Sequence, residues 1–529
     1  MSVLVHKEKR VLVTPDVPSV RQLFQHEVQE IPYKGSTRLV LPHTIPITKT
    51  LNAVVGWDIP APVSYQYDWD GGTPFEVQKK TVAMLTMNPR AYVLNGLGTG
   101  KTKSALWAFK FLKQQGLADK MLVVAPLSTL NFTWAKEIFN TLPGLSCTVL
   151  HGTRKRRLDR LAEDHDIYII NHDGLLSVQA EVTAKLLTPG NKTVMVLDEL
   201  AVYRSGTAAR TKKTRALSGL ATYVWGMTGS PTPNSPTDVW AQAMVVTPST
   251  TPKYFTRFRD EIMLKVSQFK FVPKEDALQR AFKLLQPSVR YTLDDVEELP
   301  DCVERPVDVE LGPKQEKVYK ALRSSAYAMI NNQEVTAVNA GALLNKLLQI
   351  SIGWVYSSDK SVVELDGDAR KQALLDYVQA AERKVIVFVP FKHALAGIYD
   401  LLVKEQIDVA PPVSGDTSNT ERSNIFRLFQ DTNKYRVLLA HPQCVAHGLT
   451  LTAADTIVWY APTTSLEIFE QANARIRRVG QKHKQQIIML QATHAERRIY
   501  KILREKRQVQ NDLLELFEEQ TNDGGRVFR

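Results

Sequence analysis

The hydrophobic residues of this chain form short uninterrupted runs in two long regions. In the first region the runs are AYVLN, MLVVAP, CTVLHG, IYIIN, VMVLDE and VWGMTGS, within residues 91–230. Runs of this length, separated by helical stretches, are typical of parallel strands that are buried on both faces and joined by crossover helices. The pattern therefore predicts one α/β lobe over residues 66–250.

A second set of such runs follows later in the chain: KVIVFVPF, VLLAHP, TIVWYAP and QQIIMLQA. It predicts a second α/β lobe over residues 356–495. The intervening residues 251–355 contain helical periodicity, as in VNAGALLNKLLQI, and predict a helical connector or protrusion.

The two ends differ from both lobes. Residues 1–65 are short apolar runs broken by PDVP, YKGS, LPHTIP and IPAPV, which predicts a small β-rich module. Residues 496–529 predict a charged helix followed by a fraying tail. The expected fold class is α/β, with two lobes built on parallel sheets.

Composition narrows the class of partner. A chain of 529 residues needs more than one core, and its 44% hydrophobic and 23% charged residues are typical of a globular protein. The net charge is +12, with basic clusters TRKRR at 153–157 and ARTKKTR at 209–215. This balance favours a polyanionic partner, nucleic acid before a membrane surface.

Several classes of site are not expected. Cys147, Cys302 and Cys444 are far apart and lack the spacing of a metal site or a disulfide framework. No run of about 18 apolar residues suggests a membrane span. We expect a cytoplasmic location in a bacterial cell or a phage-infected host, or a nuclear one in a eukaryote.

The stretch LNGLGTGKTKSA, residues 94–105, predicts a phosphate-binding loop. Its glycines expose backbone N–H groups before a helix N-terminus, which favours anions. In the general pattern a lysine reaches the terminal phosphates and a hydroxyl binds magnesium, roles that Lys101 and Thr102 fit. Because Asn95 stands where the strict pattern has glycine, the match is to the shorter G-x-G-K-T form, which a ligand-free glycine turn also fits.

An acidic pair follows a later apolar run. In TVMVLDELAVYR the predicted strand delivers Asp198 and Glu199 to its carboxyl end, where ligands bind in open α/β sheets. Asp198 would hold magnesium through water, and Glu199 would polarise the water that attacks the γ-phosphate. A solvated strand end is the alternative interpretation.

The second lobe supplies two arginines. In FEQANARIRRVGQKHK, Arg475 and Arg478 are three residues apart and are predicted to share one helical face. From there they would approach a γ-phosphate across a cleft and stabilise its transition state. The alternative is a basic helix facing water or a phosphate backbone.

Seven motifs in order resemble those of superfamily-two helicases: PFEVQ, GLGTGKT, VVAPLSTLNFTWAKE, VLDELA, MTGSPTPN, AHGLTLTAAD and QANARIRRVGQ. R-x-x-R-V-G-Q and TGSPTPN most resemble the Swi/Snf-type branch of DNA translocases, and THAERRIYKILREK resembles the helix that braces the second lobe in that branch. The resemblance covers residues 70–510, nearly all of the chain.

The resemblance implies an ATP-driven motor of two RecA-like lobes that uses ATP and Mg²⁺ and moves along duplex or branched DNA through backbone contacts, with no membrane involved. It assigns ATP binding to Gln78 (adenine), Gly98, Thr99, Gly100, Lys101 and Thr102. It assigns magnesium to Thr102 and Asp198, and catalysis to Lys101, Asp198, Glu199 and the arginine fingers Arg475 and Arg478. It assigns coupling to DNA to Thr228, Gly229, Ser230, Gly448, Thr450, Thr452 and Gln471.

The sequence departs from the family at several points. Leu200-Ala201 follows the acidic pair where a histidine is usual, His447 replaces a glycine, and YAPTTS replaces Trp-Asn-Pro. The connector is short and no histone-reading module is visible, so nucleosome sliding is not expected. The compact form is similar to the annealing-helicase side of the branch and to phage or bacterial relatives. A strand-separating DNA or RNA helicase and a nucleotide-switched DNA clamp remain alternatives.

Overall fold

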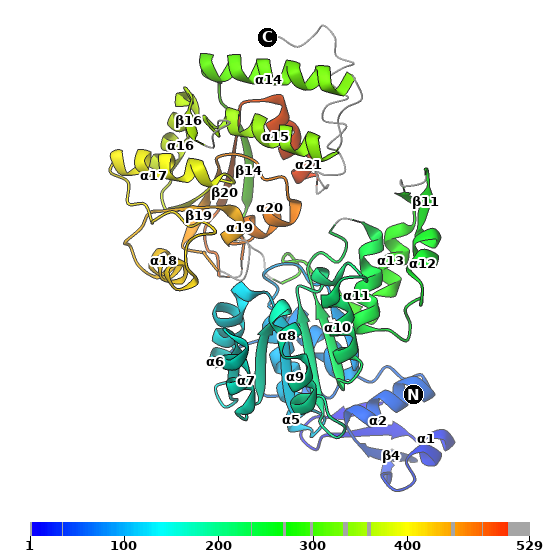
Figure 1. Ribbon diagram of the computed structural model, residues 1–529. Coiled ribbons are helices and arrows are strands. Elements are labelled where there is room, and N and C mark those ends of the chain that lie inside the picture. The colour runs from blue at the N-terminus through cyan, green and yellow to red at the C-terminus, as the bar shows by residue number, and fades with distance from the viewer. Residues whose placement is uncertain are drawn as a thin grey trace. The chain divides into compact units, whose positions relative to one another are not determined.

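The computed structural model describes residues 3–33, 35–233, 235–267, 271–296, 300–331, 337–356, 361–445, 450–478 and 480–505. The chain forms two compact units, Met1–Val296 and Glu297–Arg529. Each has its own parallel sheet (Figure 1). The predicted α/β class with two RecA-like lobes is confirmed.

A four-stranded antiparallel sheet of order β1-β2-β4-β3 begins the first unit. Its strands are β1 (Leu4–His6), β2 (Val11–Pro15), β3 (Gln29–Tyr33) and β4 (Ser36–Pro42). Two short helices, α1 (Pro18–Leu23) and α2 (Ile45–Thr50), contribute Val20 and Ile47 to a small core with Leu12, Leu39 and Leu41. The predicted β-rich N-terminal module is therefore present, with its own hydrophobic core.

The main sheet of the first unit has seven parallel strands in the order β13-β5-β10-β9-β6-β8-β7. The strands are β5 (Arg90–Val93), β6 (Lys120–Ala125), β7 (Cys147–Leu150), β8 (Ile167–Asn171), β9 (Thr193–Asp198), β10 (Tyr223–Met227) and β13 (Ser288–Val289). Six of them coincide with the apolar runs of the sequence, which are continuous because both faces of the sheet are covered.

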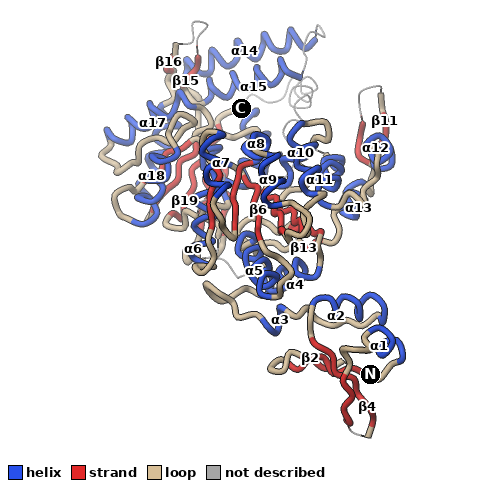
Figure 2. Tube along the Cα trace, turned by 60° about the horizontal axis from the view of Figure 1, so that its bottom comes forward, coloured by secondary structure: helices blue, strands red, loops and turns tan. Residues whose placement is uncertain are grey.

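Helices cover both faces of this sheet (Figures 1 and 2). Successive strand residues point to opposite faces, so Val123 and Val196 belong to one core and Val124 and Leu197 to the other. The first core includes α4 (Glu76–Met87), α5 (Lys101–Gln114) and α6 (Lys136–Thr141). The second includes α7 (Arg154–Ala162), α8 (His172–Ser177), α9 (Gln179–Leu186), α10 (Ala209–Ser218), α11 (Val239–Val246) and α13 (Ala277–Leu284). Helix α3 (Val63–Gln66) precedes α4.

The segment 251–355, predicted as one helical connector, is divided between the two units. Its first part forms α12 (Phe255–Ile262), the hairpin strands β11 (Met263–Lys265) and β12 (Phe271–Pro273), α13, and β13, which pairs with β5. Its second part begins with β14 (Cys302–Asp308), which pairs with β20 (Gln485–Gln491) in the other sheet. Neither strand was predicted from the sequence, because β13 has only two residues and β14 includes the polar pair Glu304-Arg305 followed by a proline.

The second unit is built on a five-stranded parallel sheet of order β14-β20-β19-β17-β18. Its other strands are β17 (Lys384–Phe388), β18 (Val437–Ala440) and β19 (Ala454–Trp459), and a separate hairpin joins β15 (Trp354–Tyr356) to β16 (Val362–Glu364). The helices are α14 (Pro313–Asn331), α15 (Ala337–Ser351), α16 (Asp368–Ala380), α17 (Lys392–Lys404), α18 (Asn419–Asp431), α19 (Pro442–Val445), α20 (Leu466–Asn473) and α21 (His494–Arg504).

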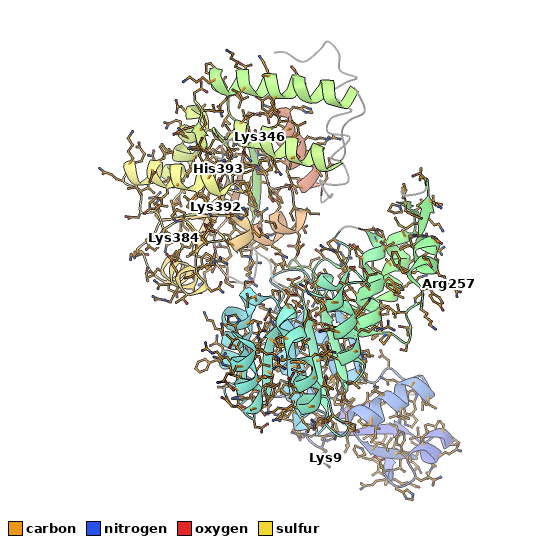
Figure 3. All side chains as sticks on the ribbon, in the orientation of Figure 1. Lys9, Arg257, Lys346, Lys384, Lys392 and His393 are labelled. Carbon is orange, nitrogen blue, oxygen red and sulfur yellow. The ribbon has the colours of Figure 1, made fainter. Side chains whose placement is uncertain are left out.

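Buried polar contacts hold helices to the second sheet. Arg370 of α16 donates from Nη2 to both carboxylate oxygens of Glu496 at 2.8 and 2.9 Å, and both side chains are almost fully buried. Lys384, at the start of β17, donates to backbone carbonyls of Phe429 and Thr432 at the end of α18 (Figure 3). Helix α21 begins the predicted C-terminal helix, whose residues beyond 505 lie outside the described part of the chain. Within the described residues, no helix has the length and apolar character needed to cross a bilayer.

Candidate active site

The loop of residues 94–100 joins β5 to α5 and requires glycine at two positions. Gly98 and Gly100 have φ angles of +80° and +77°, in the left-handed region that glycine adopts without strain. A Cβ atom on Gly100 would also lie 2.1 Å from Nε2 of Gln78. Backbone conformation and a close neighbour therefore both exclude a side chain at position 100.

Lys101 and Thr102 form the first turn of the 14-residue helix α5. The Nζ atom of Lys101 donates to the carbonyl oxygens of Asn95 and Gly96, at 2.9 Å each, so the ammonium group lies across the loop. The first N–H groups of a helix have no acceptor within the helix, and the helix dipole favours anions at that end. Loop, lysine and helix together suit a phosphate group.

Asn95 holds this loop to two other parts of the fold. Its Nδ2 donates to Oγ1 of Thr81 on α4 at 3.1 Å, and its Oδ1 accepts from the backbone N–H of Tyr291 at 3.0 Å. The side chain is 1% exposed. Asn95, which replaces the glycine of the strict pattern, therefore anchors the loop through buried hydrogen bonds. The sequence contained no signal that would pair Asn95 with Tyr291.

Gln78, the predicted adenine-binding residue, contacts the loop directly. Its Oε1 accepts from the backbone N–H of Phe75 at 2.9 Å, and its Nε2 donates to the carbonyl of Gly100 at 3.4 Å. The structure thus brings Gln78 to the phosphate loop across 22 residues of sequence. Its role toward adenine stays a prediction.

Asp198 is the last residue of β9, and each of its carboxylate oxygens accepts a hydrogen bond. Trp134 donates from Nε1 to Oδ2 at 2.9 Å, and the backbone N–H of Glu199 donates to Oδ1 at 3.1 Å. Burial raises the pKa of Asp198, and the Trp134 hydrogen bond and the positive charge of Lys101 oppose that rise. Lys101 and Asp198 therefore share one electrostatic environment. Trp134 was missed by the sequence reasoning although it lies within the motif VVAPLSTLNFTWAKE.

Glu199 has a left-handed backbone, with a φ angle of +52°. Such a conformation in a residue other than glycine costs energy and recurs at active sites. The following residue, Leu200, is fully buried, and a Cβ on Gly226 of β10 would lie 2.6 Å from its Cδ2. Leu200 therefore packs against β10 directly after the acidic pair.

The turn Thr228–Pro231 lies beside the phosphate loop. Thr228 donates its backbone N–H to the carbonyl of Val93 at 3.1 Å, and its Oγ1 accepts from the backbone of Ser230 at 3.2 Å. A Cβ on Gly229 would be 3.6 Å from the carbonyl oxygen of Asn95. The structure therefore brings this predicted coupling turn to the loop.

Two further buried side chains lie behind the acidic pair. Nδ1 of His172, the first residue of α8, is 2.8 Å from the hydroxyl of Tyr203, which ends the 3₁₀ turn Leu200–Tyr203. Burial lowers the pKa of His172 to about 4, and the backbone of Asp198 is among the groups that oppose this decrease. No sequence motif indicated this pair.

Lowering the pH from 7 to 4 is expected to destabilise the first unit through His172. Its pKa is about 4 in the folded chain and 6.5 when unperturbed, so between these values the unfolded chain binds a proton that the folded chain does not. The free energy of unfolding then falls with pH, by about 3 kcal/mol from this residue. Urea titrations at both pH values, followed by tryptophan fluorescence, measure the decrease. His172→Asn should reduce it, and an equal decrease in both proteins would contradict this origin.

Arg475 and Arg478 do not share a helical face, which corrects the prediction. Helix α20 ends at Asn473, and the arginines lie in the turns that follow. Arg475 is 2% exposed and donates from Nε to the carbonyl of Gln471 at 2.7 Å. Arg478 is partly exposed and donates from Nη1 to Oγ1 of Thr450 at 2.8 Å.

The second unit brings the predicted DNA-sensing segment to the arginine segment. The backbone N–H of Leu451 donates to the carbonyl of Arg475 at 3.1 Å. Nε2 of Gln481 donates to the carbonyls of Ala454 and Ile476 at 2.9 and 3.2 Å. Thr452 accepts at Oγ1 from Gln430 at 3.4 Å. Gly448 and His447 lie outside the described residues.

Two family models match most of this chain. The family model of the SNF2-related domain matches residues 79–352, and that of the helicase conserved C-terminal domain matches residues 369–480. Putative protein p41 of Acyrthosiphon pisum secondary endosymbiont phage 1 is 27% identical over 76% of this chain and 88% of its own length. A Xenopus laevis protein, SWI/SNF-related matrix-associated actin-dependent regulator of chromatin subfamily A-like protein 1, is 25% identical over 74% of this chain.

This chain spans only 39% of the Xenopus protein. Among solved structures, the Sulfolobus solfataricus SWI2/SNF2 ATPase core in complex with dsDNA is 22% identical, with 86% of this chain and 94% of that chain covered and a TM-score of 0.41. Two parallel-sheet units with a phosphate loop and an acidic pair define a helicase-like, ATP-hydrolysing enzyme. The chain belongs to the SNF2-related family.

Proposed function

We propose that this enzyme couples ATP hydrolysis to translocation on double-stranded or branched DNA, as in remodelling, branch migration or annealing. The observation that carries the proposal is the phosphate loop, across which the Lys101 ammonium group lies, together with the Asp198 carboxylate, whose pKa that ammonium group lowers. The two side chains combine a cation for the terminal phosphates with a carboxylate for a metal. In the proposed reaction Lys101 and the N–H groups of the loop bind the phosphates. Glu199 orients the attacking water and accepts its proton.

The residues at this site also suit Mg²⁺. Among the described residues, no group of three or more His, Cys, Asp or Glu side chains lies close enough to hold a metal. Mg²⁺ commonly takes one or two protein oxygen ligands, with phosphate oxygens and water completing its shell. The Thr102 hydroxyl and the Asp198 carboxylate fit that pattern. A bound magnesium ion would neutralise charge on the phosphates.

A basic surface on the first unit supports DNA as the polyanion. Helices α7, α8 and α10 together contain nine Lys and Arg residues and two Asp residues. Arg154 and Arg157 of α7 donate to Ser177 at the end of α8, at 3.0 and 2.8 Å, and Arg210 of α10 donates to Asp173 of α8. We call these three helices the basic cluster (Figure 1). The Xenopus relative is named as a regulator of chromatin, which agrees with a DNA partner.

Stimulation of the ATPase by DNA is expected to fall steeply as salt rises. Each phosphate contact releases condensed counterions, so three to five contacts predict a loss of roughly 40-fold to 500-fold in affinity between about 50 and 200 mM salt. The DNA concentration for half-maximal stimulation measures this loss. Duplexes of unrelated sequence should give similar values, because backbone contacts carry no sequence information. A salt-independent or sequence-specific response would contradict the proposal.

Two assays separate translocation from its alternatives. Displacement of a third strand from a triplex reports movement along duplex DNA, and displacement of one strand from a forked duplex reports unwinding. We expect ATP-dependent triplex displacement without strand separation. Strand separation would favour the helicase alternative, and DNA binding with neither activity would favour a nucleotide-switched clamp.

A further inference from the structure

The segment from Asp198 to Tyr203 makes an abrupt turn at the residue proposed to activate water. Glu199 has a left-handed backbone, and the 3₁₀ turn Leu200–Tyr203 follows at once. A strained conformation persists only where its surroundings determine it. The side chains of Leu200 and Tyr203 are both fully buried. Their packing in the core therefore fixes the backbone position of Glu199.

His172 contacts Tyr203 at the end of this turn. Its ring meets the ring of Tyr203 edge-on at 5.4 Å, and Nδ1 is 2.8 Å from the Tyr203 hydroxyl. The backbone of Asp198, at the other end of the turn, is among the groups that raise the pKa of the same imidazole. Burial keeps His172 neutral at physiological pH and raises the pKa of Tyr203 far above it, so the two side chains are joined by a hydrogen bond between neutral groups.

The helix that begins with His172 also anchors the basic cluster. The next residue, Asp173, accepts from Arg210 of α10, and Ser177 at the other end of α8 accepts from α7. Lys213 of α10 donates to the carbonyl of Leu176 at 3.4 Å. Helix α8 is therefore bound both to cationic side chains of α7 and α10 and, through His172, to the end of the turn that follows Glu199.

We propose that Tyr203 is a positioning residue for Glu199, and that its hydrogen bond to His172 transmits DNA binding at the basic cluster to the catalytic carboxylate. This inference rests on the proposed function. A displacement of α8 by phosphates bound to Arg157 or Arg210 moves His172, and with it the turn. The hydroxyl is essential to this role, whereas a phenylalanine at position 203 would preserve the packing alone.

The test compares Tyr203→Phe with the wild-type full chain. Loss of a buried hydrogen bond of about 1 kcal/mol corresponds to a roughly fivefold decrease in the ratio of DNA-stimulated to basal kcat. The KM for ATP and the Kd for duplex DNA should stay within about twofold, since Tyr203 contacts neither. The matched control is Tyr168→Phe. Tyr168 is equally buried on β8, and its hydroxyl donates to Glu163. This control should keep the wild-type ratio.

Substitutions at His172 separate the hydrogen bond from packing. His172→Asn keeps a hydrogen-bonding group near the position of Nδ1 and should retain much of the stimulation, whereas His172→Leu should lose it. Adding Tyr203→Phe to His172→Leu should cause no further loss if the two residues act as a pair. A stimulated wild type with an equally stimulated Tyr203→Phe would overturn the inference and leave the proposed function intact. A wild type that DNA does not stimulate would instead contradict the proposed function.

Discussion

Lys101→Ala is expected to abolish both ATP binding and hydrolysis. The ammonium group lies across the loop, where it donates to the carbonyls of Asn95 and Gly96, and the substitution removes the cation proposed to bind the terminal phosphates. A fluorescent ATP analogue measures binding, and phosphate release measures turnover. Lys103→Ala is the matched control, because Lys103 lies in the same helix but donates to the carbonyl of Gly71. Normal ATP affinity in Lys101→Ala would show that this loop is not the ATP-binding site.

Glu199→Gln complements Lys101→Ala, because it separates ATP binding from hydrolysis. It changes only the carboxylate proposed to accept the proton of the attacking water. ATP should therefore stay bound while the rate falls by about 10² to 10⁴, the usual contribution of a general base. Full turnover in Glu199→Gln would show that this assignment is wrong.

Arg475→Ala and Arg478→Ala are expected to lower turnover by orders of magnitude. Arginine fingers stabilise charge in the transition state and contribute about 10³ to 10⁵ in rate in GTPases. Nucleotide affinity should stay within about tenfold, since the ground-state contact is weaker, and DNA should stay bound. Steady-state kinetics with saturating DNA, beside nucleotide and DNA binding assays, measure all three quantities.

The two arginines need different controls. Arg475 is buried and holds the end of α20, so its alanine variant also requires a melting temperature and a comparison with Arg475→Lys. Arg478 is partly exposed, and Arg477→Ala, at an exposed neighbouring position, is its control. Normal hydrolysis in both alanine variants would leave the arginines as a basic surface and would favour the clamp.

The sequence predicted the two sheets because continuous apolar runs are a direct consequence of burial on both faces. It failed for β13 and β14, because β13 is very short and β14 contains several polar residues, and both form strands by pairing with β5 and β20. It also extended the helix of Arg475 too far. Nothing local marked the end of α20, where the chain turns and the Arg475 carbonyl accepts from Leu451.

The site was predictable where its residues are consecutive in one short segment. Gly98 to Thr102 is such a segment, because glycine, lysine and hydroxyl have to be consecutive to surround a phosphate. The supporting contacts join residues far apart in sequence: Trp134 with Asp198, Tyr291 with Asn95, and His172 with Tyr203. Only the folded backbone brings such pairs together.

The edge position of β13 determines where the ATP-binding unit can be cut for production. Backbone N–H groups of Tyr92, Leu94 and Gly96 donate to the carbonyls of Pro287, Val289 and Tyr291. A fragment ending at residue 250, the boundary suggested by the sequence, would leave β5 as an uncovered edge strand, which is a template for aggregation. It would also release the anchor of Asn95. A fragment that ends at residue 296 keeps both, and we expect it to yield far more soluble protein.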